Sequence, residues 1–469
     1  MMVENKSLVF GIIAVVIGAT GLGLGAFSVI SLQAIEGKQG PPGEDGQDGI
    51  DGIDGIDGID GINGTDGTDA PGYFCIIAAE VQQAVDSIGN GSGRIIITES
   101  ITLSSTININ GGGTYVIQGQ GAGIIVNCGG DWSAFDITNA TSCIIKDLKI
   151  DSSDITLTTR AIINIDEINN NPVYIEKIQI NGDFDRTGRG INIGSENIWI
   201  SDCYINKVSE GIYQSSGGEG HISDNIILDC GDYGIEIYGD YNYVSGNSLD
   251  TGSETGIRIF GSFNMIANNF IRNFDYGVMI FGDNNTIRAN NLHSLQFNGI
   301  YLYNCDNHII LGNYISDLGS AGIYSDNCPF TLISENYISS FGAYGILLIN
   351  SHSNLLSGNQ IYDGENDGIS ISYGDYNVIS GNLITNISRT DSSFFAGIFL
   401  DNDADFNSIN GNGIFHCTSS GGGTGYGIYI LGSECNDNTV IGNTSLDNDD
   451  NWQNTGTNTF GNETNNNFI

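Results

Sequence analysis

The sequence predicts an all-β protein whose main domain is a parallel β-helix, a solenoid of short strands wound in successive coils. Three observations predict it. A Gly-Ile dipeptide and an Asn each return about every 22 residues, and aliphatic residues alternate with variable ones around both. This interval is too short for a repeat that contains a helix and a strand, whereas three short strands fill one coil.

The Gly-Ile dipeptide, once Gly-Val, defines the coils. Its glycines are Gly190, Gly211, Gly234, Gly256, Gly277, Gly299, Gly322, Gly345, Gly368, Gly397 and Gly427. If each coil lies on the last, equivalent residues stack about 4.8 Å apart, the spacing of paired strands. Each Gly-Ile is therefore expected to begin one strand of a continuous sheet.

Asparagine recurs in two columns. The first contains Asn225, Asn247, Asn269, Asn290, Asn313, Asn336, Asn359, Asn382, Asn412 and Asn443. The second, five residues earlier, contains Asn242, Asn264, Asn285, Asn354, Asn377, Asn407 and Asn438, and His308 takes an equivalent place. Because Asn tolerates a left-handed bend and its amide can hydrogen-bond to neighbouring coils, we expect both columns to be structural ladders.

A short helix should precede the coils. Ala78, Val81, Val85 and Ile88 fall on one face of a helix that Gly89 would end. A solenoid must cover its first open core, and this helix is suited to that role.

Helix-capped coils with Gly-Ile and Asn columns resemble the right-handed parallel β-helix repeat family. This family has the pectin-lyase-like fold and includes the NosD-type periplasmic copper-accessory proteins. The resemblance covers about residues 73–460 and implies the fold rather than an activity. The five His residues are scattered, so copper binding does not carry over, and the polygalacturonase motifs Asn-Thr-Asp, Gly-His-Gly and Arg-Ile-Lys are missing.

The N-terminal region, residues 1–36, is expected to be a membrane anchor. Residues 8–32 form an uncharged apolar run, about 38 Å long as a helix against a hydrocarbon core of about 30 Å. A cleavable signal peptide is the alternative, although its apolar region is normally much shorter.

Residues 37–72 are expected to form a stalk. Every third residue from Gly37 to Asp69 is Gly, which resembles a collagen-like segment, because only Gly fits at the axis of a triple helix. Such a stalk could make the protein a homotrimer. With the single triplet Gly40-Pro41-Pro42, an extended acidic spacer is the alternative. The β-helix domain and a polar tail would then occupy residues 73–469.

The balance of charge excludes one class of partner. With 55 acidic and 14 basic residues, the formal net charge of −41 repels nucleic acid, whereas a neutral glycan meets no such barrier. Together with the anchor and the stalk, the acidic composition indicates a membrane-anchored protein that faces the cell exterior.

Two of the nine Cys residues should lie on adjacent coils. Cys305 and Cys328 each stand six residues after the Gly of their Gly-Ile. Their expected separation is compatible with a disulfide, and a column of reduced thiols is the alternative.

The residue after each Gly-Ile should point outward, because its aliphatic neighbours should point inward. The members of this column with ring or charged side chains are Tyr213, Glu236, Arg258, Tyr301, Tyr324, Phe399 and Tyr429. The rings could stack on sugars. Alternatively, they only stiffen an exposed sheet.

An acidic column could bind calcium. Asp232, Glu254 and Asp275 each stand two positions before a repeat Gly on successive coils, and Arg258 lies beside them. Stacked carboxylates either have a raised pKa or recruit a cation. The set resembles, in residue type, the calcium site and Arg base of the pectate-lyase-like branch of the fold. Solvated surface acids are the alternative.

The last two intervals are longer by about six residues. The insertions, at residues 389–395 and 416–426, should protrude from the same corner of adjacent coils and wall a cleft. Their candidate acid–base groups are Arg389, Asp391 and His416, and their candidate stacking rings are Phe394 and Tyr426. Tolerated surface insertions are the alternative.

These observations favour a membrane-anchored surface protein that recognises carbohydrate through its outer face and corner loops. A polysaccharide-cleaving enzyme, either a lyase or a glycoside hydrolase, is one alternative, because acid–base groups accompany the rings. A structural spacer or fibre without a ligand is the other.

Overall fold

The computed structural model describes residues 72–468 apart from 122, 124, 129–131, 154–160, 167–170, 184–187, 390–392, 457–458 and 460–465. The predicted anchor and collagen-like stalk lie outside the described residues, and the three-part division of the chain stays a prediction. Within the described part, no helix is long and apolar enough to cross a membrane.

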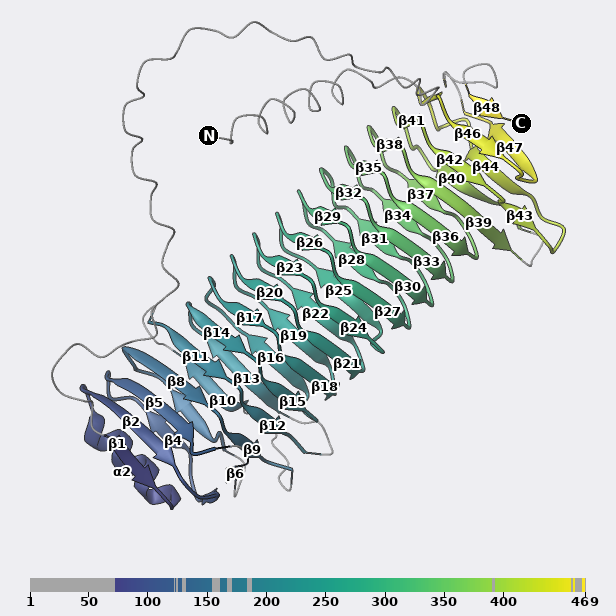
Figure 1. Cartoon of the computed structure of the whole chain (residues 1–469). Coiled ribbons are helices and arrows are strands. Elements are labelled where there is room, and N and C mark those ends of the chain that lie inside the picture. The colour runs from purple at the N-terminus through teal and green to yellow at the C-terminus, as the bar shows by residue number, and fades with distance from the viewer. Residues whose placement is uncertain are drawn as a thin grey trace, which may run out of the picture. The chain divides into compact units, whose positions relative to one another are not determined.

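The domain is a solenoid in which each coil gives one strand to each of three parallel sheets (Figure 1). Sheet A has 16 strands. They are β1 (Gly72–Cys75), β2 (Ser92–Ile97), β5 (Thr114–Gly119), β8 (Ser142–Lys146), β11 (Val173–Glu176), β14 (Ile198–Ser201), β17 (His221–Ser223), β20 (Tyr243–Ser245), β23 (Met265–Ala267), β26 (Thr286–Arg288), β29 (Ile309–Leu311), β32 (Leu332–Ser334), β35 (Leu355–Ser357), β38 (Val378–Ser380), β41 (Ser408–Asn410) and β45 (Thr439–Ile441).

Sheet B follows sheet A around each coil. Its strands are β3 (Ile101–Leu103), β6 (Ile125–Cys128), β9 (Lys149–Asp151), β12 (Gln179–Asn181), β15 (Tyr204–Asn206), β18 (Ile226–Cys230), β21 (Ser248–Gly252), β24 (Phe270–Arg272), β27 (Asn291–Leu295), β30 (Tyr314–Leu318), β33 (Tyr337–Phe341), β36 (Gln360–Gly364), β39 (Leu383–Arg389), β42 (Gly413–Phe415), β46 (Thr444–Leu446) and β48 (Asn467–Phe468). A short strand, β43 (Thr418–Ser419), pairs with the end of β39.

Sheet C has 15 strands and contains the Gly-Ile dipeptides. Its strands are β4 (Ile107–Ile109), β7 (Phe135–Ile137), β10 (Ala161–Asp166), β13 (Arg189–Gly194), β16 (Glu210–Gln214), β19 (Tyr233–Ile237), β22 (Thr255–Ile259), β25 (Tyr276–Ile280), β28 (Ile300–Tyr303), β31 (Ile323–Asp326), β34 (Ile346–Ile349), β37 (Ile369–Ser372), β40 (Phe395–Asp401), β44 (Gly425–Ile430) and β47 (Asp450–Asn454). Ile212 pairs with Ile235, and Ile235 with Ile257. The predicted in-register stacking is therefore confirmed.

The helix α2 (Ala78–Ile88) covers the first coil, as predicted (Figure 1). Val81, Val85 and Ile88 are buried and belong to the same apolar cluster as the interior of the coils. The helix therefore shields the open end of the core from water.

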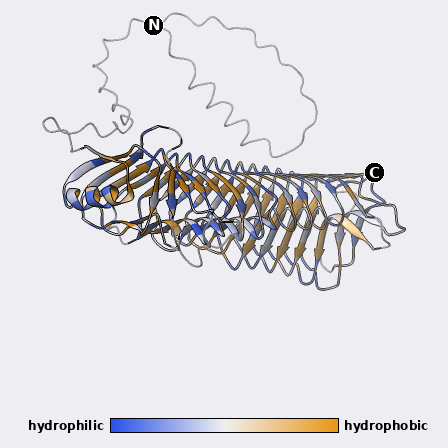
Figure 2. Ribbon diagram, turned by 90° about the horizontal axis from the view of Figure 1, so that it is seen from below, coloured by the Kyte–Doolittle hydropathy of each residue, from blue (hydrophilic) through white to orange (hydrophobic). Residues whose placement is uncertain are grey.

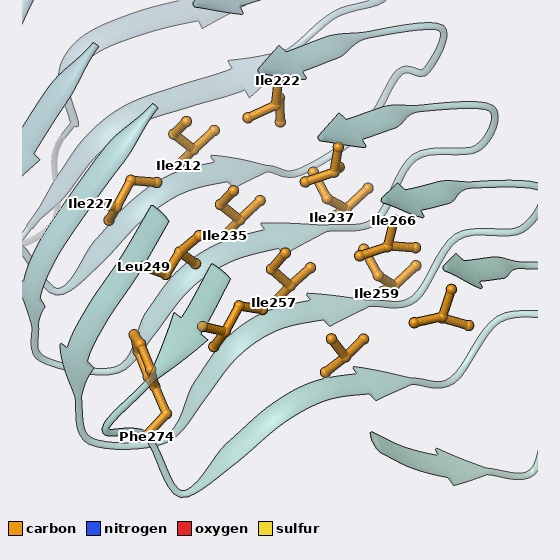
Figure 3. Packing of buried hydrophobic residues seen from close by; sticks show 14 of the residues in the cluster. Ile212, Ile222, Ile227, Ile235, Ile237, Leu249, Ile257, Ile259, Ile266 and Phe274 are labelled. Carbon is orange, nitrogen blue, oxygen red and sulfur yellow. The ribbon is translucent and has the colours of Figure 1, made fainter. Parts of the chain in front are cut away.

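The core consists of rows of aliphatic side chains, and hydrophobic residues recur along the strands of all the coils (Figure 2). Ile212, Ile235 and Ile257 of sheet C lie in a row and face Ile227 and Leu249 of sheet B (Figure 3). Because equivalent side chains repeat at intervals of about 4.8 Å, each aliphatic side chain packs closely on the same kind of side chain in the coils before and after it.

The Gly of the Gly-Ile repeat makes room for the facing sheet. A Cβ atom added to Gly322 would lie 2.3 Å from Cγ2 of Ile338 in sheet B. It would also lie 2.6 Å from the main-chain oxygen of Gly345 on the next coil. Any larger residue would force sheets B and C apart, which explains why Gly recurs here.

The first Asn column is a hydrogen-bonded ladder at the corner between sheets A and B. The main-chain N and Nδ2 of Asn225 donate to Oδ1 of Asn247 at 3.1 and 2.9 Å. Nδ2 of Asn247 donates to Oδ1 of Asn269 at 3.0 Å and to the main-chain oxygen of Ile222 at 2.9 Å. All three amides are buried, and the predicted column is confirmed.

The second column lies at the corner between sheets C and A. The main-chain N of Asn242 donates to Oδ1 of Asn264 at 2.8 Å, and that of Asn285 donates to Nδ1 of His308 at 3.2 Å. His308 therefore replaces Asn in the ladder, as predicted. Burial lowers the pKa of His308 to about 4, so the ring is neutral at pH 7 and can accept this bond.

Cys305 and Cys328 lie on adjacent coils, with their Sγ atoms 3.1 Å apart. The predicted stacking is confirmed. All nine Cys residues are buried. The contact between the two Sγ atoms leaves both the disulfide and the column of reduced thiols as predictions.

We expect His308 to destabilise the fold in acid. Its folded-state pKa of about 4 lies below the ordinary value of 6.5, so the unfolded chain binds more protons between these values. Stability is therefore lost as the pH falls from about 6.5 towards 4. The variant His308→Asn keeps an acceptor in the ladder and should remove this loss, on the order of 1–3 kcal/mol.

The measurement is the difference in Tm between the variant and the native protein at pH 7 and at pH 4.5. The difference should shift in favour of the variant at the lower pH. A difference that is the same at both values would show that His308 does not titrate in the ladder.

Candidate functional site

The outer face of sheet C carries the predicted outward column. Register places Tyr213, Glu236, Arg258, Met279, Tyr301 and Tyr324 opposite one another on successive coils. The column continues through Leu347, Ser370, Phe399 and Tyr429. None of these side chains belongs to the buried apolar cluster, so the column faces outward as predicted.

A second ring column runs beside the first. The rings of Tyr238 and Phe260 stack with centroids 4.4 Å apart and planes at 10°, and those of Phe260 and Phe281 at 4.8 Å and 13°. This column was not predicted from the sequence. It could have been recognised from an aromatic residue that stands two positions after the outward residue in four successive repeats, of which Tyr303 is the fourth.

Arg258 is the centre of an ionic cluster on this face. Its Nη1 lies 3.4 Å from Oε1 of Glu236 and donates to the hydroxyl of Tyr233. The guanidinium carbon lies 4.7 Å from the centroid of the Phe260 ring and 4.8 Å from that of Tyr233. Charge pairing and cation–π contacts thus hold Arg258 in one position.

Glu236 is unusually buried for an outward carboxylate, with 3% of its surface exposed. Burial, and next the charge of Glu210, raise its pKa, which Arg258 opposes. Burial and a hydrogen bond with Glu254 raise the pKa of Tyr233. Burial therefore shifts the titration of both groups towards their protonated forms.

The predicted acidic column is present beside this cluster. Main-chain hydrogen bonds link its coils, from N of Glu254 to O of Asp232 at 3.2 Å and from N of Tyr276 to O of Glu254 at 2.9 Å. Burial, and next the charge of Glu254, raise the pKa of Asp275. The described residues contain no grouping of three His, Cys, Asp or Glu side chains that could hold a metal ion. Calcium binding at this column stays a prediction.

The two insertions lie side by side at the corner between sheets B and C. Ser388 pairs with Thr418, and Arg389 with Ser419, so β39 and β43 extend the corner beyond its neighbours (Figure 1). His416 is exposed and adopts a left-handed conformation at the start of the second insertion. Asp391 lies outside the described residues, as does the side chain of Arg389, so their predicted roles stay predictions.

Four predicted binding rings come together next to these insertions. The ring of Tyr429 lies 5.4 Å from that of Phe394, 5.4 Å from that of Phe399 and 4.5 Å from that of Tyr426. The planes of these pairs are inclined by 73°, 47° and 40°. Phe394 is 48% exposed. We call these four residues the ring cluster.

The other predicted rings lie elsewhere on sheet C. Tyr301 and Tyr324 stack with centroids 5.0 Å apart and planes at 11°. Tyr213 lies several coils earlier, beneath the guanidinium of Arg189 at 3.4 Å. The structure therefore does not bring all the predicted binding residues into one site.

A hollow of about 530 Å³ follows the corner between sheets B and C on earlier coils. Its polar lining includes Asp275, Gln296 and Asp317. Tyr276 is the first residue of β25 in sheet C and lies at this corner. Its ring centroid is 5.4 Å from that of Phe297 and 5.8 Å from that of Tyr301. The hollow thus adjoins the outer face of sheet C.

Two family models match the chain. The model described as a right-handed β-helix region matches residues 276–445. The model described as the periplasmic copper-binding protein NosD matches residues 105–297 and 166–340. A search of curated proteins found no match.

Solved structures with a similar fold include three carbohydrate-active enzymes. The catalytic unit of a thermostable α-1,3-glucanase from Streptomyces thermodiastaticus is 14% identical, with a TM-score of 0.44, 82% of this chain and 67% of that chain covered. The A-module of a mannuronan C-5 epimerase from Azotobacter vinelandii is 14% identical, with a TM-score of 0.38 and coverage of 78% and 94%. A family 6 polysaccharide lyase from Pseudopedobacter saltans is 12% identical, with a TM-score of 0.44 and coverage of 67% and 84%.

These likenesses concern the fold. The description of the NosD model names copper, and the described residues contain no grouping of three His, Cys, Asp or Glu side chains that could hold a metal ion. The repeats, the three parallel sheets and both family models agree, and the chain belongs to the family of right-handed β-helix repeat proteins.

Proposed function

We propose that the protein recognises carbohydrate and that the ring cluster beside the stacked insertions is its main contact. The supporting observation is the inclination of the rings. Phe394, Phe399 and Tyr426 meet Tyr429 at 40° to 73°, so these rings do not stack face to face on Tyr429, and Phe394 is 48% exposed. A free aromatic face beside a protruding loop is what a sugar ring requires for stacking.

The ring geometry supports a division between the two roles that the sequence left open. In the column of Tyr238, Phe260 and Phe281, and in the pair Tyr301 and Tyr324, the rings are nearly parallel. Each ring then covers the face of its neighbour and leaves mainly its edge for a ligand. These residues stabilise the sheet through cross-strand pairing.

A neutral, extended glycan is the proposed ligand. The ring cluster itself has no charged side chain, whereas the whole chain carries a net charge of −41, which repels polyanions. The outer face of sheet C continues from the cluster across earlier coils, so several sugar units could lie along it. The predicted anchor and stalk support display of this face at the cell exterior.

Removing a ring from the cluster should weaken glycan binding. Phe394→Ala and Tyr426→Ala should each raise the Kd about fivefold to tenfold, because losing a stacking ring costs on the order of 1 kcal/mol. A glycan array would first identify a ligand, and isothermal titration calorimetry would then measure the Kd.

The matched control is Phe263→Ala. This ring is also exposed, but it stacks on Tyr241 at a different corner, with centroids 5.0 Å apart. Its loss should leave the Kd unchanged. Equal effects of Phe263→Ala and Phe394→Ala, or no effect of either, would rule out the ring cluster as the binding site.

Polysaccharide cleavage is the second candidate, and the burial of Glu236 favours it. Cleavage by acid–base chemistry needs a carboxyl group that stays protonated near neutral pH. Burial shifts the pKa of Glu236 in this direction, and Arg258 is close enough to stabilise developing negative charge.

If the protein cleaves glycans at this cluster, Glu236→Gln should lower kcat by about two to four orders of magnitude. The measurement of kcat is the rate at which oligosaccharides are released from the glycan. Glu335→Gln, an exposed carboxylate that follows β32 at the corner between sheets A and B, is the control. Asp391→Asn and His416→Ala test instead the acid–base groups predicted in the insertions. Unchanged release in the Glu236 variant would exclude this carboxyl group as the acid.

A further inference from the structure

The first coil exposes three large apolar side chains. Phe74, Ile76 and Ile77 are 67%, 51% and 54% exposed. Cys75 between them is buried in the core, so alternation along β1 directs Phe74 away from it. We call Phe74, Ile76 and Ile77 the N-terminal patch.

Hydrogen bonds to the side chain of Glu80 hold the backbone of the patch in place. Oε2 of Glu80 accepts hydrogen bonds from the main-chain N of Ile76 at 2.7 Å and of Ile77 at 3.3 Å. Ile77 also occupies the N-cap position of α2, where Ser, Thr, Asp or Asn would stabilise the helix. An apolar residue in this position breaks a local rule and leaves apolar surface exposed.

The patch is confined to the end of the solenoid. In register with Phe74 on sheet A follow Ile96, which is half-buried, and then Gln118 and Lys146. Polar side chains therefore replace apolar ones within two coils. Residues 72–79 contain no charged side chain, so the negative charge of the chain is not concentrated there.

A triple helix of the predicted collagen-like stalk would bring further copies of the chain to this end. The Gly-x-y triplets end at Asp69, three residues before Gly72. Three extended residues span about 10 Å, so in a triple helix the Gly72 residues of three copies would lie within about 10 Å of the point where the chains part. We propose that the N-terminal patches of three copies pack together there and form the head of a homotrimer.

This contact would compensate for a weak stalk. The triplets include only one Pro-Pro pair, and a triple helix with so little Pro is marginal by itself. Burial of the N-terminal patches at the end of the stalk aligns the three chains. Less conformational entropy is then lost when the stalk forms a triple helix.

The test is the oligomeric state of the full chain in detergent, measured by sedimentation over a range of concentrations. The native protein should be a trimer. The triple variant Phe74→Ser, Ile76→Ser, Ile77→Ser should dissociate at a concentration about tenfold higher or more, because each copy loses buried apolar area. The matched control replaces three exposed apolar residues of other coils, Phe263→Ser, Ile309→Ser and Phe330→Ser, and should stay trimeric.

A second variant tests the same contact in case the triple Ser variant does not fold. In Ile76→Cys, a three-armed maleimide should link three chains, since the nine native Cys are buried, and Phe330→Cys should give no linked trimer. A native protein that is monomeric, a patch variant that dissociates at the native concentration, or no linked trimer through residue 76 would overturn the proposal.

Discussion

The buried asparagine ladders are the constraint on which the rest of the structure depends. Each amide of the first column takes part in hydrogen bonds with both neighbouring coils, as Asn247 does with Asn225 and Asn269. An amide left unpaired inside the core would cost on the order of 1–3 kcal/mol, so a coil cannot slip by one residue without breaking its ladder contacts. Register fixed in this way aligns the side chains of the outer faces into columns.

The same constraint explains where the chain varies. The ladders occupy the corner between sheets A and B and the corner between sheets C and A. Both insertions lie at the third corner, between sheets B and C, and Asn382 still bonds to Asn412 at 3.0 Å across the longer coil. Loops can therefore lengthen at the third corner without disturbing either ladder, and the ring cluster is next to it.

The fold could be predicted because its causes are periodic in the sequence. Gly-Ile and Asn recur at the interval of one coil, so their register, the outward column and the replacement of Asn by His308 follow from counting. Ring inclination could not be predicted, because it depends on side-chain torsions and on the offset between coils. The contacts of Arg258 with Tyr233 and Phe260 were missed for a related reason: Tyr233 lies on the preceding coil and Phe260 two residues along the same coil, and neither belongs to the outward column.

The two ends of a solenoid are also structurally independent of each other. Each coil contacts mainly its neighbours, so a change at one end need not propagate to the other. The ring cluster lies on β40 and β44, near the end of the 15-stranded sheet C, roughly 60 Å from the first strand at about 4.8 Å for each coil. The N-terminal patch lies on the first coil. The chain can therefore combine an assembly surface at one end with a recognition surface at the other, and the uniform coils between them set only the distance.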